Sequence, residues 1–515
     1  MSLFSPITQG FLFTDFYQLT MAQVYFNYDL HLLEAQFEYF FRSYPNYGQH
    51  QAGFCIFAGL ETFFQWLNRA KPTPKDLDYL KTLTSRNKKP LFSPAFLDWL
   101  AQIDFRELEI KAIPEGRAVH PYVPLVTVKG PFALAQLIET PLLNTLNYQT
   151  LIATKAARIK EAAWGQTVMD FGLRRAQWLG GNAGTRAALI GGVEFSSNVG
   201  TSSILNLPPK GTHAHSLVQA FMALGYSEEQ AFEAFAQIFP DDCILLIDTI
   251  NTLESGLPNA IKIFQKLQKK GHKPLGIRID SGDLAYLAVQ CYLELKKAHL
   301  EDCLIILSNQ LDELVIQQII TQIKQEAHDY HIIPEEIISK LVFGTGTRLI
   351  TSAGCCSLDG VYKLTAIKKH SDWEPALKIS DSPSKLLIPG EKKTYRLTDK
   401  RNKYMVDLIC LETEELPFNN KEFTIFHPQD SNVFRTIQSK DIAKIELLQI
   451  DIQKNGQIVY DFPDLKTIQK QKEKDLEHLD KGVKRLIKPH NYHVSITKQV
   501  YALREKLLKK YQNKS

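Results

Sequence analysis

Two histidines stand one residue apart in the stretch KGTHAHSLVQAF (210–221), after a Gly-Thr turn and before an apolar helical pattern. His213 and His215 could be metal ligands, a general base, a phosphoryl acceptor or two surface histidines. A metal pair gains no support, because no third ligand stands nearby at the spacing of a zinc enzyme. His215 falls near a helix N-terminus, which attracts anions and disfavours a charged imidazole. That position favours His215 as a neutral nucleophile.

The stretch RIDSGD (278–283) supplies a cation and two carboxylates where a strand is expected to end. Arg278 and Asp280 are two residues apart, so on a strand they point to the same face. An arginine fork binds a carboxylate or a phosphate through paired hydrogen bonds, and an aspartate suits ribose hydroxyls or Mg²⁺. The alternative is a structural salt bridge followed by Asp283 as a helix N-cap.

The stretch MDFGLRRA (169–176) places an aromatic ring beside further cations. Phe171 could stack on an aromatic ligand, and Arg174 could bind an anion. Phe171 fits a hydrophobic core equally well, so this stretch alone does not separate a binding role from a packing role.

Two glycine-containing stretches are candidate anion sites. In FGTGTR (343–348) the glycines let the backbone approach an anion, while Thr345 and Thr347 add hydroxyl donors. Barrels often bind phosphate in their late loops. LIGGVEFSSNVG (189–200) combines an apolar strand with a Ser-Ser-Asn turn, and a phosphate loop and a plain βα loop fit it equally well. The chain has no P-loop pattern.

The elements that must position these residues are short apolar runs of the kind that a strand buried on both faces requires. They are TVMDFG (167–172), CILLID (243–248), LGIRID (275–280), CLIILS (303–308) and KLVFG (340–344). Helical patterns separate the last four, whose starts lie 32, 28 and 37 residues apart, close to the length of a β-α repeat. This alternation predicts a parallel sheet with helical crossovers.

Polar residues gather where each of these strands ends. A closed or irregular barrel brings all strand ends to one face, whereas an open sheet gathers only those near its switch point. Four successive strands end in polar residues, which favours an α/β fold with an irregular β/α barrel. These polar strand ends are Asp248 and Thr249, Arg278 and Asp280, Ser308 and Asn309, and GTGT (344–347).

The two flanks of the chain have a different pattern. Residues 1–135 mix helical and extended stretches, which predicts an N-terminal α/β domain before a barrel at 136–358. Residues 359–515 show strands of a partly antiparallel sheet and a terminal helix, expected to complete a flanking α/β (α+β) domain. The basic stretch KQKEKDLEHLDKGVKRLIKPH (470–490) has interleaved acids, which favours a solvated helical face.

Composition narrows the class of protein. The 515 residues are 44% hydrophobic and 23% charged, typical of a soluble globular protein, and suggest about three domains or one large barrel with additions. A formal charge of +4 gives no support for nucleic-acid binding. The seven cysteines are scattered along the chain without paired spacing, which indicates reduced, buried thiols. With no membrane-length apolar run and no signal-peptide pattern, the expected location is the cytoplasm.

Taken together, motifs spread along nearly the whole chain resemble the nicotinate phosphoribosyltransferase family of type II phosphoribosyltransferases. They are TDFYQLTMAQVYF, ETPLLNTLNYQTLIATKAARI, DFGLRRA, GTHAHSLVQAF, LLIDTINTLESG, GIRIDSGDL, LSNQLDE, FGTGTRLIT, GVYKL and LIKPHNYHVS, in this order. The resemblance implies that nicotinate and 5-phosphoribosyl 1-diphosphate give nicotinate mononucleotide and diphosphate, the first step of NAD synthesis from nicotinate. It also implies ATP as co-substrate, Mg²⁺ and a homodimer with shared active sites.

The resemblance also implies roles for individual residues. His215 and Asp280 would be catalytic, with His215 transiently phosphorylated by ATP and His213 a neighbour without that role. Tyr17, from the partner subunit, and Phe171 would sandwich the pyridine ring. The remaining implied contacts are Thr212 and Arg278 to the nicotinate carboxylate, and Arg174, Asp280, Asn309, Gly346 and Thr347 to the phosphoribosyl and diphosphate groups.

Three rival interpretations remain. A nicotinamide phosphoribosyltransferase would carry an aspartate just after the Gly-Thr pair, where this chain has His213, so an acid substrate is favoured. A quinolinate phosphoribosyltransferase would need a richer basic cluster and no phosphohistidine. A catalytically silent binding protein would have no reason to retain Tyr17, His215, Arg278 and Asp280 together.

Overall fold

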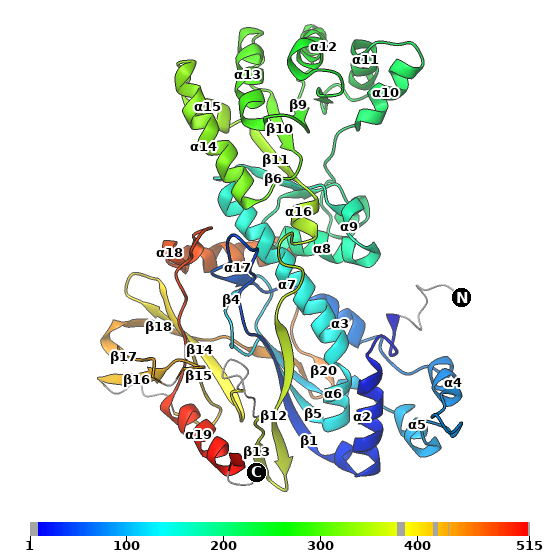
Figure 1. Ribbon diagram of the computed structural model, residues 1–515, viewed down its shortest axis with the longest axis vertical. Coiled ribbons are helices and arrows are strands. Elements are labelled where there is room, and N and C mark those ends of the chain that lie inside the picture. Colours follow the sequence, from blue (N-terminus) through cyan, green and yellow to red (C-terminus); the bar gives the residue numbers. More distant parts are fainter. Residues whose placement is uncertain (1–8, 379–386, 416–420, 431, 513–515) are drawn as a thin grey trace. The chain divides into compact units, whose positions relative to one another are not determined.

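The computed structural model describes residues 9–378, 387–415, 421–430 and 432–512, and Figure 1 colours its ribbon along the chain. The chain divides into two compact units, one of residues 1–151 with 357–515 and one of residues 152–356. The sequence predicts three segments, 1–135, 136–358 and 359–515; in the structure the outer two build one unit. In this unit α6 (Phe132–Leu137) packs on α2 (Phe16–Asn27), β1 (Glu34–Phe41) and β5 (Val126–Pro131). The boundary lies near residue 151 and not at 136 because the first half of the next helix also bonds to this unit: Tyr39 donates to Asn147 at 2.9 Å, and Ala58 N donates to Thr150 at 3.2 Å.

The unit of residues 152–356 is built on one parallel sheet in the order β7-β6-β11-β10-β9-β8. Five of its strands are the ones the apolar runs predict. The strands are β6 (Thr167–Asp170), β7 (Phe195–Ser196), β8 (Ile244–Leu246), β9 (Gly276–Ile279), β10 (Leu304–Ser308) and β11 (Leu341–Thr345). The sheet ends at β7 and β8, so the irregular barrel expected from the sequence is confirmed in the form of a curled half-barrel.

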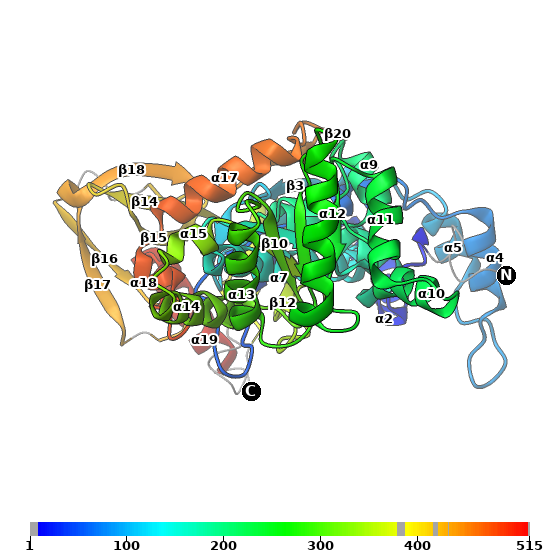
Figure 2. The same ribbon diagram turned by 90° about the horizontal axis from the view of Figure 1, so that it is seen from above.

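Helices follow the strands of the half-barrel in turn, as the repeat spacing predicts. Those between the later strands are α11 (Glu228–Ile238), α12 (Leu257–Lys269), α13 (Leu284–Lys297) and α14 (Glu313–Asp329), which stand side by side in Figures 1 and 2. Asp283 caps α13 by accepting hydrogen bonds from the backbone N–H groups of Ala285 and Tyr286 at 3.1 and 3.2 Å. The N-cap interpretation of Asp283 is therefore confirmed.

Further helices complete this unit. They are the second half of α7 (Glu139–Ala162), α8 (Trp178–Ile190), α9 (Val199–Ile204), α10 (His215–Ala223), α15 (Pro334–Ile338) and α16 (Thr347–Ile350). Glu313 at the start of α14 is fully buried and pairs with Lys155 and Arg158 of α7 at 2.6 and 3.1 Å. Because a buried charge is costly without partners, this ion group ties α7 to α14.

The unit of residues 1–151 and 357–515 contains two larger sheets and the short pair β2 (Cys55–Ile56) with β4 (Ala118–Val119). The first sheet has the order β13-β12-β1-β5-β3-β19-β20, with β3 (Glu109–Ala112), β12 (Gly360–Lys369), β13 (Asp372–Pro375), β19 (Ile450–Lys454) and β20 (Gln457–Ile458). Since β1 pairs with β12 and β3 with β19, strands from both ends of the chain share one sheet. This pairing makes the two flanks one unit.

The second sheet of this unit comes from the C-terminal part alone, in the order β17-β16-β21-β15-β14-β18. Its strands are β14 (Lys392–Asp399), β15 (Tyr404–Leu411), β16 (Glu422–Phe426), β17 (Phe434–Gln438), β18 (Ile442–Leu447) and β21 (Val494–Ile496). The helices of the unit include α3 (Leu60–Leu67), α4 (Pro74–Thr82), α5 (Pro94–Leu100), α17 (Leu465–His478), α18 (Lys481–Lys484) and α19 (Lys498–Gln512). No helix among the described residues is both long and apolar enough to cross a membrane.

Most cysteines are buried as the sequence predicts, but two are not. Cys55, Cys243, Cys291, Cys303 and Cys410 are buried, whereas Cys355 is half-buried and Cys356 is exposed. Burial raises the pKa of the Cys243 thiol to about 12, so this side chain behaves as a small hydrophobe.

A buried charge network joins four elements of the unit built from both ends of the chain. The Arg396 guanidinium on β14 donates to both carboxylate oxygens of Asp407 on β15 at 2.7 Å and to Asp475 of α17 at 3.3 Å. Its Nη2 also donates to the Ala118 carbonyl of β4 at 2.8 Å. Asp475 accepts a further bond of 2.8 Å from Arg117. The solvated face predicted for residues 470–490 is therefore wrong at Asp475, which is fully buried.

We expect Asp475→Ala to destabilise this unit by about 3–5 kcal/mol, because Arg117 and Arg396 would lose a shared buried partner. Burial alone would raise the pKa of Asp475, but Arg117 and Arg396 outweigh it and lower that pKa. The stabilisation should therefore be complete above the unfolded pKa of about 3.9 and be lost as the pH falls through the lowered folded pKa.

Urea unfolding of the wild type and the variant at neutral and acid pH measures this difference. Asp451→Ala is the matched control, since its partner Lys454 forms an exposed pair whose loss should cost less than about 1 kcal/mol. Equal unfolding midpoints for the two variants at neutral pH would contradict the prediction.

Candidate active site

The parallel order of the half-barrel places the candidate residues in a row. The carboxyl ends of parallel strands lie at the same edge of a sheet, and β6, β11, β10, β9 and β8 are neighbours in that order. The side chains delivered to this edge are Phe171 after β6, Ser308 of β10, Arg278 and Asp280 of β9, and Asp248 after β8. Four of these five residues, all except Phe171, are polar strand ends that the sequence predicts to converge. In the structure these four are linked by hydrogen bonds.

Arg278 is held in place from three sides. Its Nε donates to Ser308 Oγ at 2.9 Å, its Nη1 to Thr212 Oγ1 at 3.2 Å and its Nη2 to Asp280 Oδ1 at 3.1 Å. The guanidinium carbon lies 5.2 Å from the centroid of the Phe171 ring, a cation–π distance. Three of its five N–H groups are thus used to orient it, and no described residue accepts a hydrogen bond from the other two. Thr212, Arg278 and Asp280, which the sequence assigns to two different substrate groups, are thus in direct contact.

Phe171 owes its position to a glycine on the next strand. A Cβ atom on Gly344 of β11 would lie 2.5 and 2.6 Å from two ring carbons of Phe171. The backbone N–H of Phe171 also donates to the Thr345 carbonyl at 2.7 Å. The ring is buried and packs with Met169, Ile306 and Val342, so the core interpretation and the stacking interpretation of Phe171 both have structural support.

His215 begins α10, as the sequence predicts, and its ring is fixed by a carboxylate. Its Nε2 lies 3.1 Å from Oδ1 of Asp248, whose side chain is 2% exposed. The other carboxylate oxygen of Asp248 accepts from the backbone N–H of Asp280 at 3.0 Å and from Ser281 Oγ at 2.5 Å. One buried carboxylate therefore connects the start of α10 to the end of β9. The sequence marked Asp248 as a strand end but gave it no role.

His213 is buried and forms part of the framework. Its Nε2 accepts a hydrogen bond from the backbone N–H of Leu246 at 3.0 Å, and its Nδ1 lies 3.3 Å from the Ala214 carbonyl. Burial is the main cause that lowers the pKa of His213, and its ring packs edge-on against Phe235. A neutral His213 thus fastens the segment before α10 to β8.

Asp170, at the end of β6, anchors the loop that was a candidate phosphate site. Its carboxylate accepts from Gly172 N at 2.8 Å, Thr185 Oγ1 at 2.9 Å and Ser196 Oγ at 2.8 Å, and burial raises its pKa. Asn198 caps α9. Because these polar groups serve internal bonds, the plain βα-loop interpretation of residues 189–200 is favoured. The apolar strand expected there is wrong, since Leu189 and Ile190 end α8.

The stretch 343–348 also differs from the expectation in one residue. Thr345 is fully buried and donates to the Met169 carbonyl at 3.1 Å, so its predicted role as a free hydroxyl donor is wrong. On an extended strand the neighbouring side chains alternate between faces, and Thr345 faces inward. Gly346 precedes α16, and Thr347 is half-buried at its start.

Among the described residues, neither Arg174 nor Asn309 nor Tyr17 forms a hydrogen bond or an ion pair with Arg278 or His215. Arg174 and Asn309 are exposed, and Asn309 has a left-handed backbone with φ of 97°. Tyr17 belongs to α2 in the other unit, where its side chain is 47% exposed. Burial and then Glu139 raise the pKa of Tyr17, so its hydroxyl is neutral at physiological pH.

Residues for a metal ion are few. Among the described residues, no group of three or more histidine, cysteine, aspartate or glutamate side chains could hold one. Asp280 Oδ1 is engaged by Arg278 and Ser308, whereas no described residue donates to its Oδ2. One available carboxylate oxygen fits Mg²⁺ that is held mainly by substrate phosphates.

A parallel half-barrel with a cation, carboxylates and an oriented imidazole at its strand ends defines an α/β enzyme that handles anionic substrates. Three family models match the chain: the nicotinate phosphoribosyltransferase N-terminal domain at residues 12–147, the nicotinate phosphoribosyltransferase family at 166–408 and the C-terminal domain at 391–504.

Individual relatives agree along nearly the full length. The nicotinate phosphoribosyltransferase of Bacillus subtilis (strain 168) is 35% identical, with 95% of this chain and 94% of the relative covered. The human enzyme of the same name is 30% identical, with 96% and 95% covered. The crystal structure of human nicotinic acid phosphoribosyltransferase superposes with a TM-score of 0.80 at 28% identity and covers 96% of this chain and 99% of that one. The chain belongs to the nicotinate phosphoribosyltransferase family.

We expect Gly344→Ala to cost about 1–3 kcal/mol of folding free energy, because the new methyl group would displace the Phe171 ring. Urea unfolding followed by circular dichroism measures the change. Gly200→Ala in α9 is the control, since its Cβ would meet only Asn198 Oδ1 at 3.8 Å and should be neutral or slightly stabilising. If both variants unfold at the wild-type midpoint, Gly344 does not position Phe171.

Proposed function

We propose that this chain transfers the phosphoribosyl group of 5-phosphoribosyl 1-diphosphate to nicotinate, with ATP hydrolysis coupled through a phosphohistidine at His215. The products are nicotinate mononucleotide, diphosphate, ADP and phosphate, the first step of NAD synthesis from nicotinate. The observation that carries the proposal is the oriented His215–Asp248 pair beside Arg278 and Asp280, in a member of this family.

His215 acts as the phosphoryl acceptor. Asp248 is an acceptor only, so the His215 proton lies on Nε2 and the lone pair lies on Nδ1. Nδ1 attacks the γ-phosphorus of ATP, the N–P bond forms, the bond from phosphorus to the bridging oxygen breaks, and ADP leaves. The position at the N-terminus of α10 favours the added negative charge. Asp248 stabilises the positive charge that develops on the ring.

Arg278 and Thr212 bind the carboxylate of nicotinate. The two free N–H groups of Arg278 match a carboxylate fork, while Ser308, Asp280 and Phe171 hold the guanidinium in the orientation that such pairing needs. Phe171 provides the face on which the pyridine ring stacks. An acid substrate is favoured over nicotinamide, because both ring nitrogens of His213 are engaged by backbone groups and neither is offered to an amide.

The phosphoribosyl and diphosphate groups bind at the strand ends beside this pocket. Arg174, Asn309, Gly346 and Thr347 supply donors, and Asp280 supplies a carboxylate for the ribose or for Mg²⁺ through its Oδ2. Mg²⁺ neutralises the leaving diphosphate when it is bound with that substrate. As diphosphate departs, positive charge develops at the anomeric carbon of the ribose. The Asp280 carboxylate stabilises this charge.

The active form is a cytoplasmic homodimer in which Tyr17 completes the partner's site. Tyr17 and its neighbour Phe16 are 47% and 53% exposed on α2, an unusual exposure for adjacent aromatic rings that fits a covered position in an assembly.

A coupled assay with 5-phosphoribosyl 1-diphosphate and Mg²⁺ tests the proposal, with nicotinate or nicotinamide and with or without ATP. We expect mononucleotide from nicotinate only, faster with ATP and accompanied by ADP. Turnover of nicotinamide instead would refute the acid preference, and no product from either pyridine would favour the binding-protein alternative.

His215→Ala should retain residual transferase activity and lose ATP stimulation, since the variant lacks the phosphoryl acceptor but retains Arg278 and Phe171. The measurements are mononucleotide formation with and without ATP and incorporation of labelled γ-phosphate. His272→Ala is the control, because His272 and Asp241 form a similar pair at 3.1 Å at the surface of the same unit. Stoichiometric labelling of His215→Ala would show that the acceptor is another residue.

A further inference from the structure

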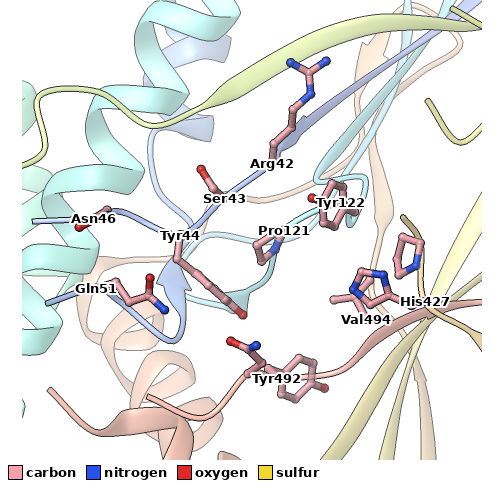
Figure 3. A pocket seen from close by; sticks show the side chains of 12 residues that line it. Arg42, Ser43, Tyr44, Asn46, Gln51, Pro121, Tyr122, His427, Tyr492 and Val494 are labelled. Carbon is pink, nitrogen blue, oxygen red and sulfur yellow. The ribbon is translucent and has the colours of Figure 1, made fainter. Parts of the chain in front are cut away.

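A pocket of about 370 Å³ lies in the unit of residues 1–151 and 357–515, and none of its lining residues belongs to the active site proposed above. Four strand ends supply its lining: Arg42–Tyr44 follow β1, Pro121 and Tyr122 follow β4, His427 follows β16, and Asn491 and Tyr492 precede β21. Figure 3 shows Tyr44, Pro121, His427 and Tyr492 around a common space. The motif LIKPHNYHVS, which has no role in the proposed reaction, contributes Asn491 and Tyr492.

Two aromatic walls of this pocket are rigid because buried groups hold their hydroxyls. Tyr44 Oη lies 2.7 Å from His120 Nδ1, and the His120 ring stacks on Tyr492 at 3.7 Å. Tyr492 Oη donates to Asp407 at 3.0 Å and so joins the Arg396 network. The two rings therefore have fixed positions in the lining, a preorganisation that favours binding of a planar group. Because His120 is stacked on Tyr492 and that residue is only 9% exposed, Tyr492 bounds the pocket without offering a free ring face.

The lining offers donors and one cation but no acid. No aspartate or glutamate is among the lining residues, although Ser43 of the lining donates to the Asp359 carboxylate at 3.4 Å. His427 Nδ1 accepts from the backbone N–H groups of Gln429 and Asp430 at 3.2 Å, so its proton lies on Nε2. Asn46 and Asn491 add amide groups that both donate and accept.

One backbone feature marks the same place. Tyr122 has a left-handed backbone with φ of 68°, which a bulky residue adopts at a cost that the surrounding structure must outweigh. Its N–H donates to the Phe41 carbonyl at 2.8 Å, which keeps the side chain in the lining.

We propose that this pocket binds a nucleoside monophosphate. The base lies against the Tyr44 and Tyr122 rings, the amides of Asn46 and Asn491 bond its polar edge, and the phosphate pairs with Arg42. The volume lies in the range of small-molecule sites, and rings with a single cation suit a planar molecule that carries one anionic group. The proposal stands independently of the phosphoribosyltransferase reaction.

Isothermal titration of the full chain with AMP, adenosine and inorganic phosphate tests this proposal. We expect AMP to bind the wild type at least roughly tenfold more tightly than adenosine or phosphate alone, and roughly tenfold more tightly than it binds Arg42→Gln. Arg401→Gln is the matched control, since Arg401 is an exposed arginine of the same unit that pairs with Asp399. Arg278→Gln separates this pocket from the active site, and both of these variants should bind AMP as the wild type does.

Three outcomes would overturn the proposal. AMP binding that is lost in Arg278→Gln and kept in Arg42→Gln would place the nucleotide in the active site. If adenosine or phosphate binds as tightly as AMP, the pocket does not recognise the nucleotide as a whole. If AMP binding is undetectable, the pocket is not a site for a nucleoside monophosphate. If Arg42→Gln does not fold by circular dichroism, Asn46→Ala at an exposed lining position gives the same comparison.

Discussion

The buried carboxylate of Asp248 holds together the parts of the half-barrel that carry its chemistry. It lies after the edge strand β8, and its two oxygens accept bonds from His215 at the start of α10 and from the backbone of Asp280 after β9. A carboxylate with 2% exposure would be costly alone, so these bonds are strong in the low dielectric around it. The orientation of the imidazole, and thereby which ring nitrogen carries the proton, follows from this contact. Asp248 also fixes the position of Arg278 indirectly, because it binds the backbone of Asp280, whose carboxylate accepts a hydrogen bond from Arg278.

Two arginines show how burial separates structural from functional charge. Arg396 is fully buried and donates to Asp407, Asp475 and the Ala118 carbonyl, so its donors serve the fold. The Arg278 side chain is 13% exposed and has two N–H groups for which no described residue is an acceptor, and its three bonds fix where those two groups lie. A fully paired buried charge joins elements, whereas a partly paired charge at a strand end is prepared for a ligand.

Much of the half-barrel was predictable because its signals are local. The apolar runs at 243–248, 275–280 and 303–308 are strands, the intervening helices are where the periodicity predicts them, and Asp283 caps α13. The polar residues at the strand ends do meet at one edge of the sheet, Arg278 and Asp280 among them. The errors lie where the outcome depends on distant partners. Asp475 appears in a charged helical pattern, yet Arg117 and Arg396 from far along the chain draw it into the interior.

The sequence by itself determined the class of fold, the family and the residue types available for phosphoryl and carboxylate chemistry, because these depend on periodicity, spacing and motif order. Only the tertiary structure decided that β11 lies between β6 and β10, that Asp248 is the partner of His215, and that His213 serves the framework. It also decided that Gly344 makes room for Phe171, and that both chain ends share one sheet. The physical reason is that strand pairing and buried polar contacts join residues widely separated along the chain. A shift of one residue on a strand also turns a side chain from one face to the other, as Thr345 shows.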